Sequence, residues 1–240
     1  MKIKLLVLTT LLSTLQFAYA DEASLKKKIE EAYPKFKVES IVKTPYAGLY
    51  EVFMGGQIVY TDEKLTFLIA EGHLVDPKTR KDITGERLEE LTKIDFNSLP
   101  LDKAIKVVKG NGSRKIAVFS DVDCPYCKRL ERNELSHITD VTIYTFLYPL
   151  EQLHPDAAEK SKLIWCAANR EQAWNDWILH DKLPKSAGNC DVPLEDIGEL
   201  ARKVGVASTP TLIFSDGKRM MGAQPYKAIE EAMRAASNKK

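Results

Sequence analysis

Apolar residues near the start of the chain recur with the period of a helix. Leu25, Ile29 and Tyr33 fall at four-residue spacing with charged residues between them, which predicts an amphipathic helix over residues 21–33. Pro34 has no backbone N–H with which to continue the helical hydrogen bonds, so the helix should end there.

The pattern then changes to short runs of the kind that form β-strands. Residues 49–54 and 57–61 flank Gly55-Gly56, a pair typical of the two-residue turn of a β-hairpin. Residues 64–70 and 73–75 are two further short runs. With the preceding helix, these runs predict a small α+β unit with an antiparallel sheet. So small a unit is marginal alone, and an exposed edge or apolar face on it suggests dimerisation.

A second helix is expected between this unit and the rest of the chain. Leu88, Leu91 and Ile94 recur on one side of residues 85–94, and charged residues occupy the other positions. This helix either connects two domains, as part of a linker over residues 81–100, or packs on one of them. The sequence leaves both interpretations open.

The rest of the chain follows the order β–β–α–β–α–α–β–β–α. A strand–helix–strand start, a helical insertion, and a closing hairpin with a terminal helix form the plan of an α/β thioredoxin-like domain. A strong turn signal, Lys109-Gly110-Asn111-Gly112, joins the first two strands. The predicted elements are residues 104–108, 115–120, 130–135, 141–147, 155–177, 194–204, 211–214, 218–221 and 225–236.

The first twenty residues have the features of a secretory signal peptide. Two lysines precede an apolar stretch over residues 5–17, and Ala18-Tyr19-Ala20 has the small-x-small pattern of a cleavage site. The apolar stretch is short for a bilayer span; the alternative is an uncleaved membrane anchor. An exported chain meets an oxidising compartment, in which disulfides persist.

Charge and length narrow the classes of function. Removal of residues 1–20 takes Lys2 and Lys4 from the formal net charge of +1, which leaves about −1. A nearly neutral chain gives no indication of nucleic acid or an anionic membrane as a partner. The chain is also long enough to bury a core without disulfides, so a close cysteine pair is better explained by redox chemistry.

The close pair is Cys124-Pro125-Tyr126-Cys127, which follows the predicted strand 115–120. Cys124 should therefore lie at a helix N-terminus, where unpaired N–H groups and the helix dipole favour a thiolate. Cys127, one turn later, should be more buried and closer to an ordinary thiol. In this hypothesis Cys124 attacks a substrate disulfide and Cys127 resolves the mixed disulfide. Pro125 suits the first helical turn and, with the ring of Tyr126 beside the reactive sulfur, tunes the redox potential.

Two other uses of the motif are a fixed disulfide and half of a zinc site. A zinc site needs two more ligands at suitable spacing. Cys166 and Cys190 do not form a second such motif, and the four histidines show no clustered spacing. We therefore expect redox chemistry that uses neither a metal nor a cofactor.

Cys166 and Cys190 are the second cysteine pair. They lie 24 residues apart in a domain that we expect to be exported. A structural disulfide between them would contribute roughly 3 kcal/mol through loop entropy. The alternative is two buried free thiols.

Thr209-Pro210 precedes the apolar run of residues 211–214. A cis proline at this point would leave the preceding backbone free to pair with an extended substrate. Most such bonds are trans, so the alternative is an ordinary loop proline.

Titratable residues near the motif offer further candidates. Asp121 or Asp123 could raise a thiol pKa or relay a proton for Cys127, although we expect solvated or helix-capping carboxylates. His137 and His154 could act as bases, but neither is at a motif spacing, and we expect surface or loop positions for both.

Three segments resemble one known family. Residues 118–130, Val-Phe-Ser-Asp-Val-Asp-Cys-Pro-Tyr-Cys-Lys-Arg-Leu, resemble the active-site stretch of the DsbC/DsbG family of periplasmic thiol–disulfide interchange proteins. Residues 164–167, Ile-Trp-Cys-Ala, and residues 205–211, Gly-Val-Ala-Ser-Thr-Pro-Thr, are similar to a second segment and to the cis-proline loop of that family. The order of parts is similar too: signal peptide 1–20, N-terminal dimerisation domain 21–80, linker helix 81–100 and thioredoxin-like catalytic domain 101–240.

The resemblance implies a V-shaped homodimer joined by the N-terminal domains, with two active sites facing an apolar cleft that holds unfolded substrates. It also implies periplasmic disulfide isomerase and reductase activity on misoxidised exported proteins, with some chaperone activity. An inner-membrane electron donor of the DsbD type would keep the motif reduced.

The roles implied by the resemblance follow position by position. Cys124 is the nucleophile, Cys127 resolves, and Thr209-Pro210 is the substrate-binding loop. Apart from the resemblance, we expect the ring of Tyr126, beside the reactive sulfur, to be a further substrate contact. Cys166 and Cys190 match the structural cysteine pair of the family, which favours the DsbC branch.

Pro125 departs from the best-known DsbC pattern, which has Gly at this position; Pro is typical of DsbG. The reduction potential, and the balance between isomerase and reductase activity, therefore stay open. Two other functions compete with this interpretation: a monomeric dithiol oxidase resembling DsbA, and a non-catalytic periplasmic holdase with two structural cysteine pairs.

Overall fold

The computed structural model describes residues 10–238, with side chains from residue 21 onward. The chain divides between Leu91 and Thr92 into two compact units, here unit 1 and unit 2. The structure describes the expected signal peptide only in part: residues 1–9 lie outside the described residues, and the backbone of residues 10–20 is helical. Within the described part, no helix has both the length and the apolar character that a membrane crossing requires.

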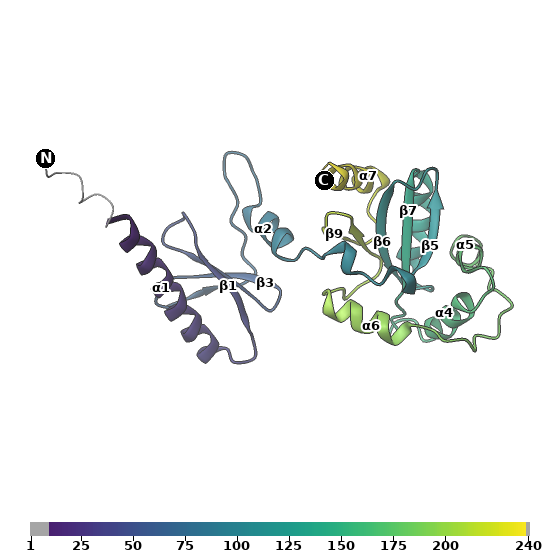
Figure 1. The fold of residues 1–240 in the computed structure, drawn as a ribbon, viewed down its shortest axis with the longest axis horizontal. Helices are drawn as coiled ribbons and strands as arrows, with labels where there is room; N and C mark the ends of the chain where they lie inside the picture. Colours follow the sequence, from purple (N-terminus) through teal and green to yellow (C-terminus); the bar gives the residue numbers. More distant parts are fainter. Residues whose placement is uncertain (1–9, 239–240) are drawn as a thin grey trace, which may run out of the picture. The chain divides into compact units, whose positions relative to one another are not determined.

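Unit 1 is a four-stranded antiparallel sheet with a helix on each face (Figure 1). The strands follow the chain order β1-β2-β3-β4, and Gly55 and Gly56 form the predicted hairpin turn with positive φ angles of 60° and 76°. The elements are α1 (Thr10–Ala32), β1 (Val38–Lys43), β2 (Tyr50–Met54), β3 (Gln57–Thr61), β4 (Leu68–Ile69) and α2 (Ile83–Leu91).

Strand alternation distributes the apolar side chains of unit 1 to both faces of its sheet. Leu25 and Ile29 of α1, both fully buried, pack in one cluster with Val52 and other residues of β1–β3. Phe53, the next residue along β2, points to the other face. There it forms a cluster with Ile58, Tyr60, Leu74, Leu88 and Leu91.

The expected linker of residues 81–100 is helical over α2 and over a short 3₁₀ helix, η1 (Phe96–Ser98). Helix α2 packs on the unit 1 sheet, and the buried hydroxyl groups of Tyr60 and Thr84 lie 2.6 Å apart. Phe96 belongs to a core cluster of unit 2. Of the two sequence interpretations, the structure therefore shows the one in which the helix packs on a single unit.

Two predicted strands of unit 1 differ from the structure. The run 64–70 yields only the two-residue strand β4, and the run 73–75 yields a single bridge between Val75 and Asp82. Strand β1 was not predicted at all, because only Val38 of its residues is buried and the pattern carries little alternation.

Unit 2 is a five-stranded sheet in the order β5-β7-β6-β8-β9, with helices on both faces (Figure 1). Strands β6 and β7 are parallel and the other neighbours are antiparallel. The strands are β5 (Ile105–Lys109), β6 (Arg114–Ser120), β7 (Val141–Leu147), β8 (Thr211–Phe214) and β9 (Arg219–Met221). The predicted turn does connect β5 to β6 along the chain, but in the sheet β7 lies between these two strands.

Strand β6 is buried on both faces and shows how the layers form. Ile116 and Val118 pack in one core cluster with Trp174, Ile178, Ile229 and Met233. Ala117 and Phe119 pack in the other, with Ile197 and Ala201. The helices that supply these residues are α5 (Arg170–His180), α6 (Leu194–Lys203) and α7 (Tyr226–Ser237).

The predicted helix over residues 155–177 is two helices, α4 (Ala157–Trp165) and α5. Asn169 starts the second: its side chain accepts a hydrogen bond from the backbone N–H of Gln172 at 3.0 Å. This capping signal was present in the sequence and was missed.

One edge of the unit 2 sheet gathers three segments that are distant in the chain. Ser120, the last residue of β6, pairs with Leu147, the last residue of β7, because the two strands are parallel. Phe119 pairs with Thr211, the first residue of antiparallel β8. The segments that leave β6 and β7 and the segment that enters β8 therefore meet at this edge, where the candidate site lies.

Candidate active site

Cys124 is the N-cap of the helix that carries the motif, α3 (Pro125–Arg129). Its backbone is extended, with φ −65° and ψ 122°, and its carbonyl accepts a hydrogen bond from Lys128 N–H at 3.1 Å. Pro125 occupies the first turn, where a missing N–H costs nothing. The Cys124 sulfur faces the free N–H groups of that turn and accepts from Tyr126 and Cys127.

These donors lower the pKa of Cys124 to about 5. The largest cause is the hydrogen bond from the Cys127 thiol, followed among the favourable contacts by the Cys127 N–H, Thr209 and the Tyr126 N–H. Burial opposes them, because Cys124 is only 5% exposed and an apolar environment disfavours the charged form. The donors prevail, and Cys124 is a thiolate at neutral pH.

Cys127 is fully buried, and burial is the main reason that its pKa is raised above the ordinary thiol value. Its thiol donates to Cys124, which raises the pKa further, while Ser120 and the backbone of Asp121 oppose the shift. The expectation of a nearly ordinary thiol is therefore wrong. The two sulfurs therefore differ strongly in acidity.

Thr209-Pro210 is a cis peptide that lies directly against Cys124. In its thiol form Cys124 donates from Sγ to the Thr209 carbonyl at 3.6 Å. Pro125 and Tyr126 are exposed beside them, Tyr126 by 60%. The structure thus brings together the two motif cysteines and the proline loop, which are 85 residues apart.

The other two cysteines are joined. Cys166 and Cys190 form a disulfide that ties the segment after α5 to the end of α4. Cys190 N–H also donates to Cys166 Sγ at 3.2 Å. Among the described residues, the free cysteines are Cys124 and Cys127.

Asp121 was expected to be solvated or to cap a helix, and the structure corrects this expectation. It is fully buried and accepts three hydrogen bonds: from Asp123 N–H at 2.8 Å, from Leu150 N–H at 2.6 Å and from His154 Nδ1 at 3.0 Å. His154 does lie in a loop, but it is bound to this carboxylate. The sequence signal was weak: an acid three residues before Cys124.

Two lysines near the motif, Lys128 and Lys160, share one aromatic ring. Lys128 and Lys160 place their ammonium groups 4.5 Å and 5.2 Å from the ring centre of Trp177. The indole N–H of Trp177 donates to the carbonyl of Val122 at 2.7 Å, and Lys160 pairs with Asp123 at 2.7 Å. Trp177 therefore supports the segment that leads into Cys124, a role that the sequence did not reveal.

A buried carboxyl follows the motif. The predicted regular helix after Cys127 contains a π-helical turn, η3 (Leu130–Glu134), and a 3₁₀ turn, η4 (Leu135–His137). Burial raises the pKa of Glu131 in this turn to about 7, against the opposing effects of Lys109 and Trp174. His137, at the end of the segment, lies beside the ring of Tyr226, with centroids 5.0 Å apart.

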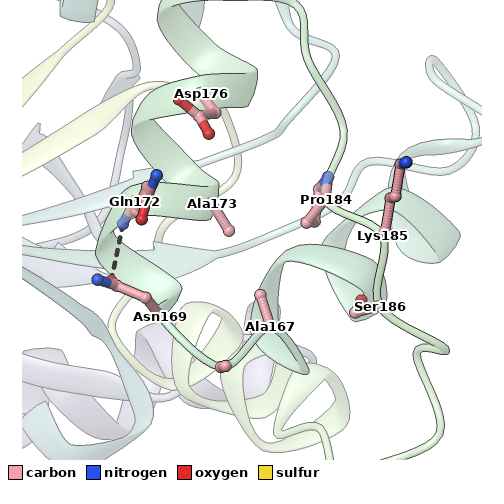
Figure 2. Close-up of a pocket in the computed structure, with 9 residues that line it drawn as sticks. Ala167, Asn169, Gln172, Ala173, Asp176, Pro184, Lys185 and Ser186 are labelled. Atoms are coloured by element: carbon pink, nitrogen blue, oxygen red, sulfur yellow. Dashed lines mark hydrogen bonds between the residues drawn. The ribbon is translucent and has the colours of Figure 1, made fainter.

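Among the described residues, no metal centre accompanies the motif. Across residues 10–238, no group of three or more His, Cys, Asp or Glu side chains is arranged to hold a metal ion. A pocket of about 290 Å³ lies between α5 and the segment after it (Figure 2). Gln172, Asp176 and Lys185 line it, but no residue of the motif or of the proline loop does, so it is separate from the candidate site.

Models of known protein families match the sequences of both units. Residues 101–237 match the model of the thioredoxin-like domain family. Residues 16–85 match the model of the disulfide bond isomerase protein N-terminal domain. The two matches fall in unit 2 and unit 1 respectively.

Individual relatives give the same assignment. The probable thiol:disulfide interchange protein DsbC of Bordetella parapertussis is 43% identical over 86% of this chain and 72% of its own. The Escherichia coli thiol:disulfide interchange protein DsbC is 27% identical over 96% of this chain and 95% of its own. A disulfide interchange protein from Neisseria gonorrhoeae, of known structure, is 46% identical with a TM-score of 0.55, over 57% of this chain and 98% of its own. The chain therefore belongs to the DsbC family of thiol:disulfide interchange proteins, which are thiol–disulfide oxidoreductases.

Proposed function

We propose that this chain is a periplasmic disulfide isomerase and reductase that acts on misoxidised exported proteins. The observation that carries the proposal is the contrast between the two motif cysteines. Cys124 has a pKa lowered to about 5 and lies beside the proline loop, while Cys127 is fully buried and stays protonated. A thiolate nucleophile with a reserved second thiol is what disulfide exchange requires.

The first step is attack of the Cys124 thiolate on one sulfur of a substrate disulfide. That disulfide breaks, a Cys124–substrate mixed disulfide forms, and the second substrate sulfur leaves as a thiolate that takes up a proton. No net oxidation has occurred at this point.

The mixed disulfide then has two fates. A different substrate thiolate can attack the substrate sulfur, which forms a new substrate disulfide and releases Cys124 unchanged; this is isomerisation. Alternatively, Cys127 attacks Cys124, which releases a reduced substrate and leaves the motif oxidised; this is reduction. The second fate requires an electron donor, for which we propose an inner-membrane protein of the DsbD type.

The residues around Cys124 suit an extended polypeptide. Thr209 and Pro210 lie against the nucleophile, and the exposed ring of Tyr126 offers an apolar contact. We assign these three residues to substrate binding and Pro125 to tuning of the redox potential. The segment before β8 would pair with substrate backbone in the manner of an added strand.

Unit 1 supports a homodimer. It matches the N-terminal domain of disulfide bond isomerases, and several of its large apolar side chains are more than one third exposed. These side chains are Tyr33, Phe36, Val42, Tyr46, Phe67, Ile69 and Val75. Light scattering of residues 21–240 should give the mass of two chains, and a monomer at micromolar concentration would contradict the dimer.

The decisive test of activity is the refolding of a scrambled protein that contains several disulfides. The wild-type chain should restore native pairing, Cys124→Ala should not, and Cys127→Ala should retain part of the isomerisation while losing net reduction. Cys127→Ala is the matched control, because it removes a buried thiol without removing the nucleophile. Full activity of Cys124→Ala would contradict catalysis by Cys124 and favour the holdase. If the wild-type chain oxidises dithiols but does not rearrange disulfides, the result would favour the oxidase.

A further inference from the structure

The side chain of Arg219, in strand β9, binds two segments of unit 2 that are distant in the sequence. Its Nη2 donates to the carbonyl of Thr92 at 2.6 Å, and its Nη1 donates to the carbonyl of Gly205 at 3.0 Å. Thr92 is the first residue of unit 2, and Gly205 begins the loop of residues 205–210 that ends at Pro210. One guanidinium group therefore joins the start of unit 2 to the start of this loop.

Strand β9 and the residue after it hold both ends of the loop of residues 205–210. At the end that enters β8, Gly222 N–H donates to the carbonyl of Pro210 at 2.8 Å. At the other end the side chain of Arg219 holds Gly205, while the backbone of Arg219 pairs with Ile213 of β8. The loop is therefore fixed at both ends by one short strand.

The segment of unit 2 to which Arg219 ties the loop is itself fixed. Ile94 is buried, and its N–H donates to the carbonyl of Gly217 at 2.9 Å. Gly217 has a φ angle of 84°, and a Cβ at this position would clash with the carbonyl oxygen of Ile94. Residues 92–94 therefore lie close against the turn between β8 and β9 and offer Arg219 a firm support.

The hydrogen bonds of Arg219 form in a partly desolvated place. Its Nε is buried and has no hydrogen-bond partner among the described residues, and burial lowers the pKa of the guanidinium group. Hydrogen bonds from a charged donor are stronger than those between neutral groups, and they gain further strength away from water. The two bonds to backbone carbonyls must therefore offset the cost of the buried Nε, which makes them the main contacts of this side chain.

We propose that Arg219 is a positioning residue for substrate binding, which holds the loop of residues 205–210 in place so that Thr209 and Pro210 can receive an extended substrate. The inference rests on the function proposed above, in which these two residues bind substrate backbone beside Cys124. The largest cause of the lowered pKa of Cys124 is Cys127, which lies on another segment. Loss of Arg219 should therefore weaken the capture of a polypeptide and leave the reactivity of the thiolate nearly unchanged.

The experiment compares two disulfides of different size as probes. One probe joins two extended peptides, and the other is hydroxyethyl disulfide, which is too small to pair with the backbone of the loop. The full chain with Cys124 and Cys127 reduced is mixed with each probe, and the second-order rate of disulfide consumption is measured. Arg219→Ala should lower the rate with the peptide disulfide about tenfold and change the rate with the small disulfide by less than about twofold.

Two further variants separate the hydrogen bonds of Arg219 from its charge. Arg219→Lys keeps the positive charge but has no planar fork that can bind both carbonyls, so its rate with the peptide disulfide should also fall. This variant also replaces Arg219→Ala if the latter does not fold. Arg202→Ala is the matched control, because exposed Arg202 lies in the last turn of α6, close in sequence to Gly205, and its loss removes the same charge. Both rates of this control should stay at the wild-type values.

Hydrogen exchange followed by mass spectrometry tests the support itself. In Arg219→Ala the backbone N–H groups of residues 92–96 and of residues 205–209 should both exchange faster than in the wild type, because each segment loses the same anchor. Exchange in β6 should stay unchanged, which also establishes that the variant is folded before its rates are compared.

The outcomes distinguish the inference from the function on which it rests. The role of Arg219 is wrong, and the exchange function stands, if folded Arg219→Ala keeps the wild-type rate with the peptide disulfide, if its two rates fall equally, or if Arg202→Ala behaves in the same way. A full rate with the peptide disulfide in Arg219→Lys would assign the effect to charge alone and would also overturn the inference. If the wild-type chain reacts with neither disulfide, the proposed function itself is wrong.

Discussion

The buried carboxylate of Asp121 lies 3.0 Å from Nδ1 of His154. This contact joins the segment that leads into Cys124 to the segment that follows β7. The same carboxylate accepts from the backbone N–H groups of Asp123 and Leu150, so both segments depend on one side chain.

Replacement of Asp121 by Ala should lower the free energy of unfolding by about 3 kcal/mol, because buried N–H groups would lose their acceptor. Urea denaturation measures the difference. Asp156→Ala is the control, since the Asp156 side chain is 81% exposed and its loss should cost less than about 0.5 kcal/mol. Equal stability of Asp121→Ala and the wild type would show that the carboxylate does not hold the site together.

The acidity of Cys124 can be measured through the ultraviolet absorbance of its thiolate. In the reduced protein the transition should have a midpoint near the pKa of about 5. Cys127→Ala should raise the midpoint, because the Cys127 thiol is the largest cause of the lowered pKa. Cys124→Ala should show no transition in this range, since the pKa of Cys127 is raised. A wild-type midpoint near the ordinary thiol value of about 8.5 would contradict the described hydrogen bonds.

Glu131 should make stability depend on pH. Its folded-state pKa is raised to about 7 from 4.5, so between these values the folded state binds more protons than the unfolded state. Stability is therefore fully present below pH 4.5 and is lost as pH rises to about 7, by roughly 3 kcal/mol. Glu131→Gln should remove this loss.

This experiment is best done on the oxidised protein, in which Cys124 does not titrate. In the reduced protein Cys124 has the opposite effect: its lowered pKa makes stability rise with pH above about 5. Denaturation midpoints between pH 4 and 8 that are parallel in Glu131→Gln and the wild type would show that Glu131 is not protonated in the fold.

Trp177→Phe should weaken the approach to the motif. Phenylalanine keeps most of the buried ring but has no N–H, so the carbonyl of Val122 loses its donor. We expect a loss of about 1–2 kcal/mol in urea denaturation, with weaker ring contacts to Lys128 and Lys160. Trp165→Phe would be a poor control, because its N–H is also bonded, to Asp191. Tyr144→Phe is the better control, because Tyr144 packs against the other core cluster of unit 2.

Strong local patterns predicted much of the fold. The runs at residues 141–147 and 211–214 coincide with β7 and β8, because β-branched and aromatic residues fill both strands and both are buried. Strand β1 escaped notice because it is an edge strand with a single buried residue. The position of β7 between β5 and β6 could not be inferred from a turn signal, which fixes a bend but not the neighbour of each strand.

The candidate site was likewise predicted from the sequence only in part. The spacing of Cys124 and Cys127, together with the strand before them and the expected export of the chain, predicted this pair as the reactive thiols. Two of the three partners of Asp121, Leu150 and His154, lie 29 and 33 residues further along the chain, and only the fold brings them to it. The burial that separates the acidities of the two cysteines is likewise a property of the assembled core.

The recessed position of Cys124 has a consequence for what the protein can act on. Only 5% of Cys124 is exposed, so its sulfur can react only with a disulfide that is itself accessible on the surface of its own chain. A disulfide buried in a folded protein cannot reach the Cys124 sulfur, whereas a disulfide in an unfolded, extended segment can. Under the proposed function, steric access alone would spare natively folded proteins and select misoxidised ones, without recognition of a particular sequence.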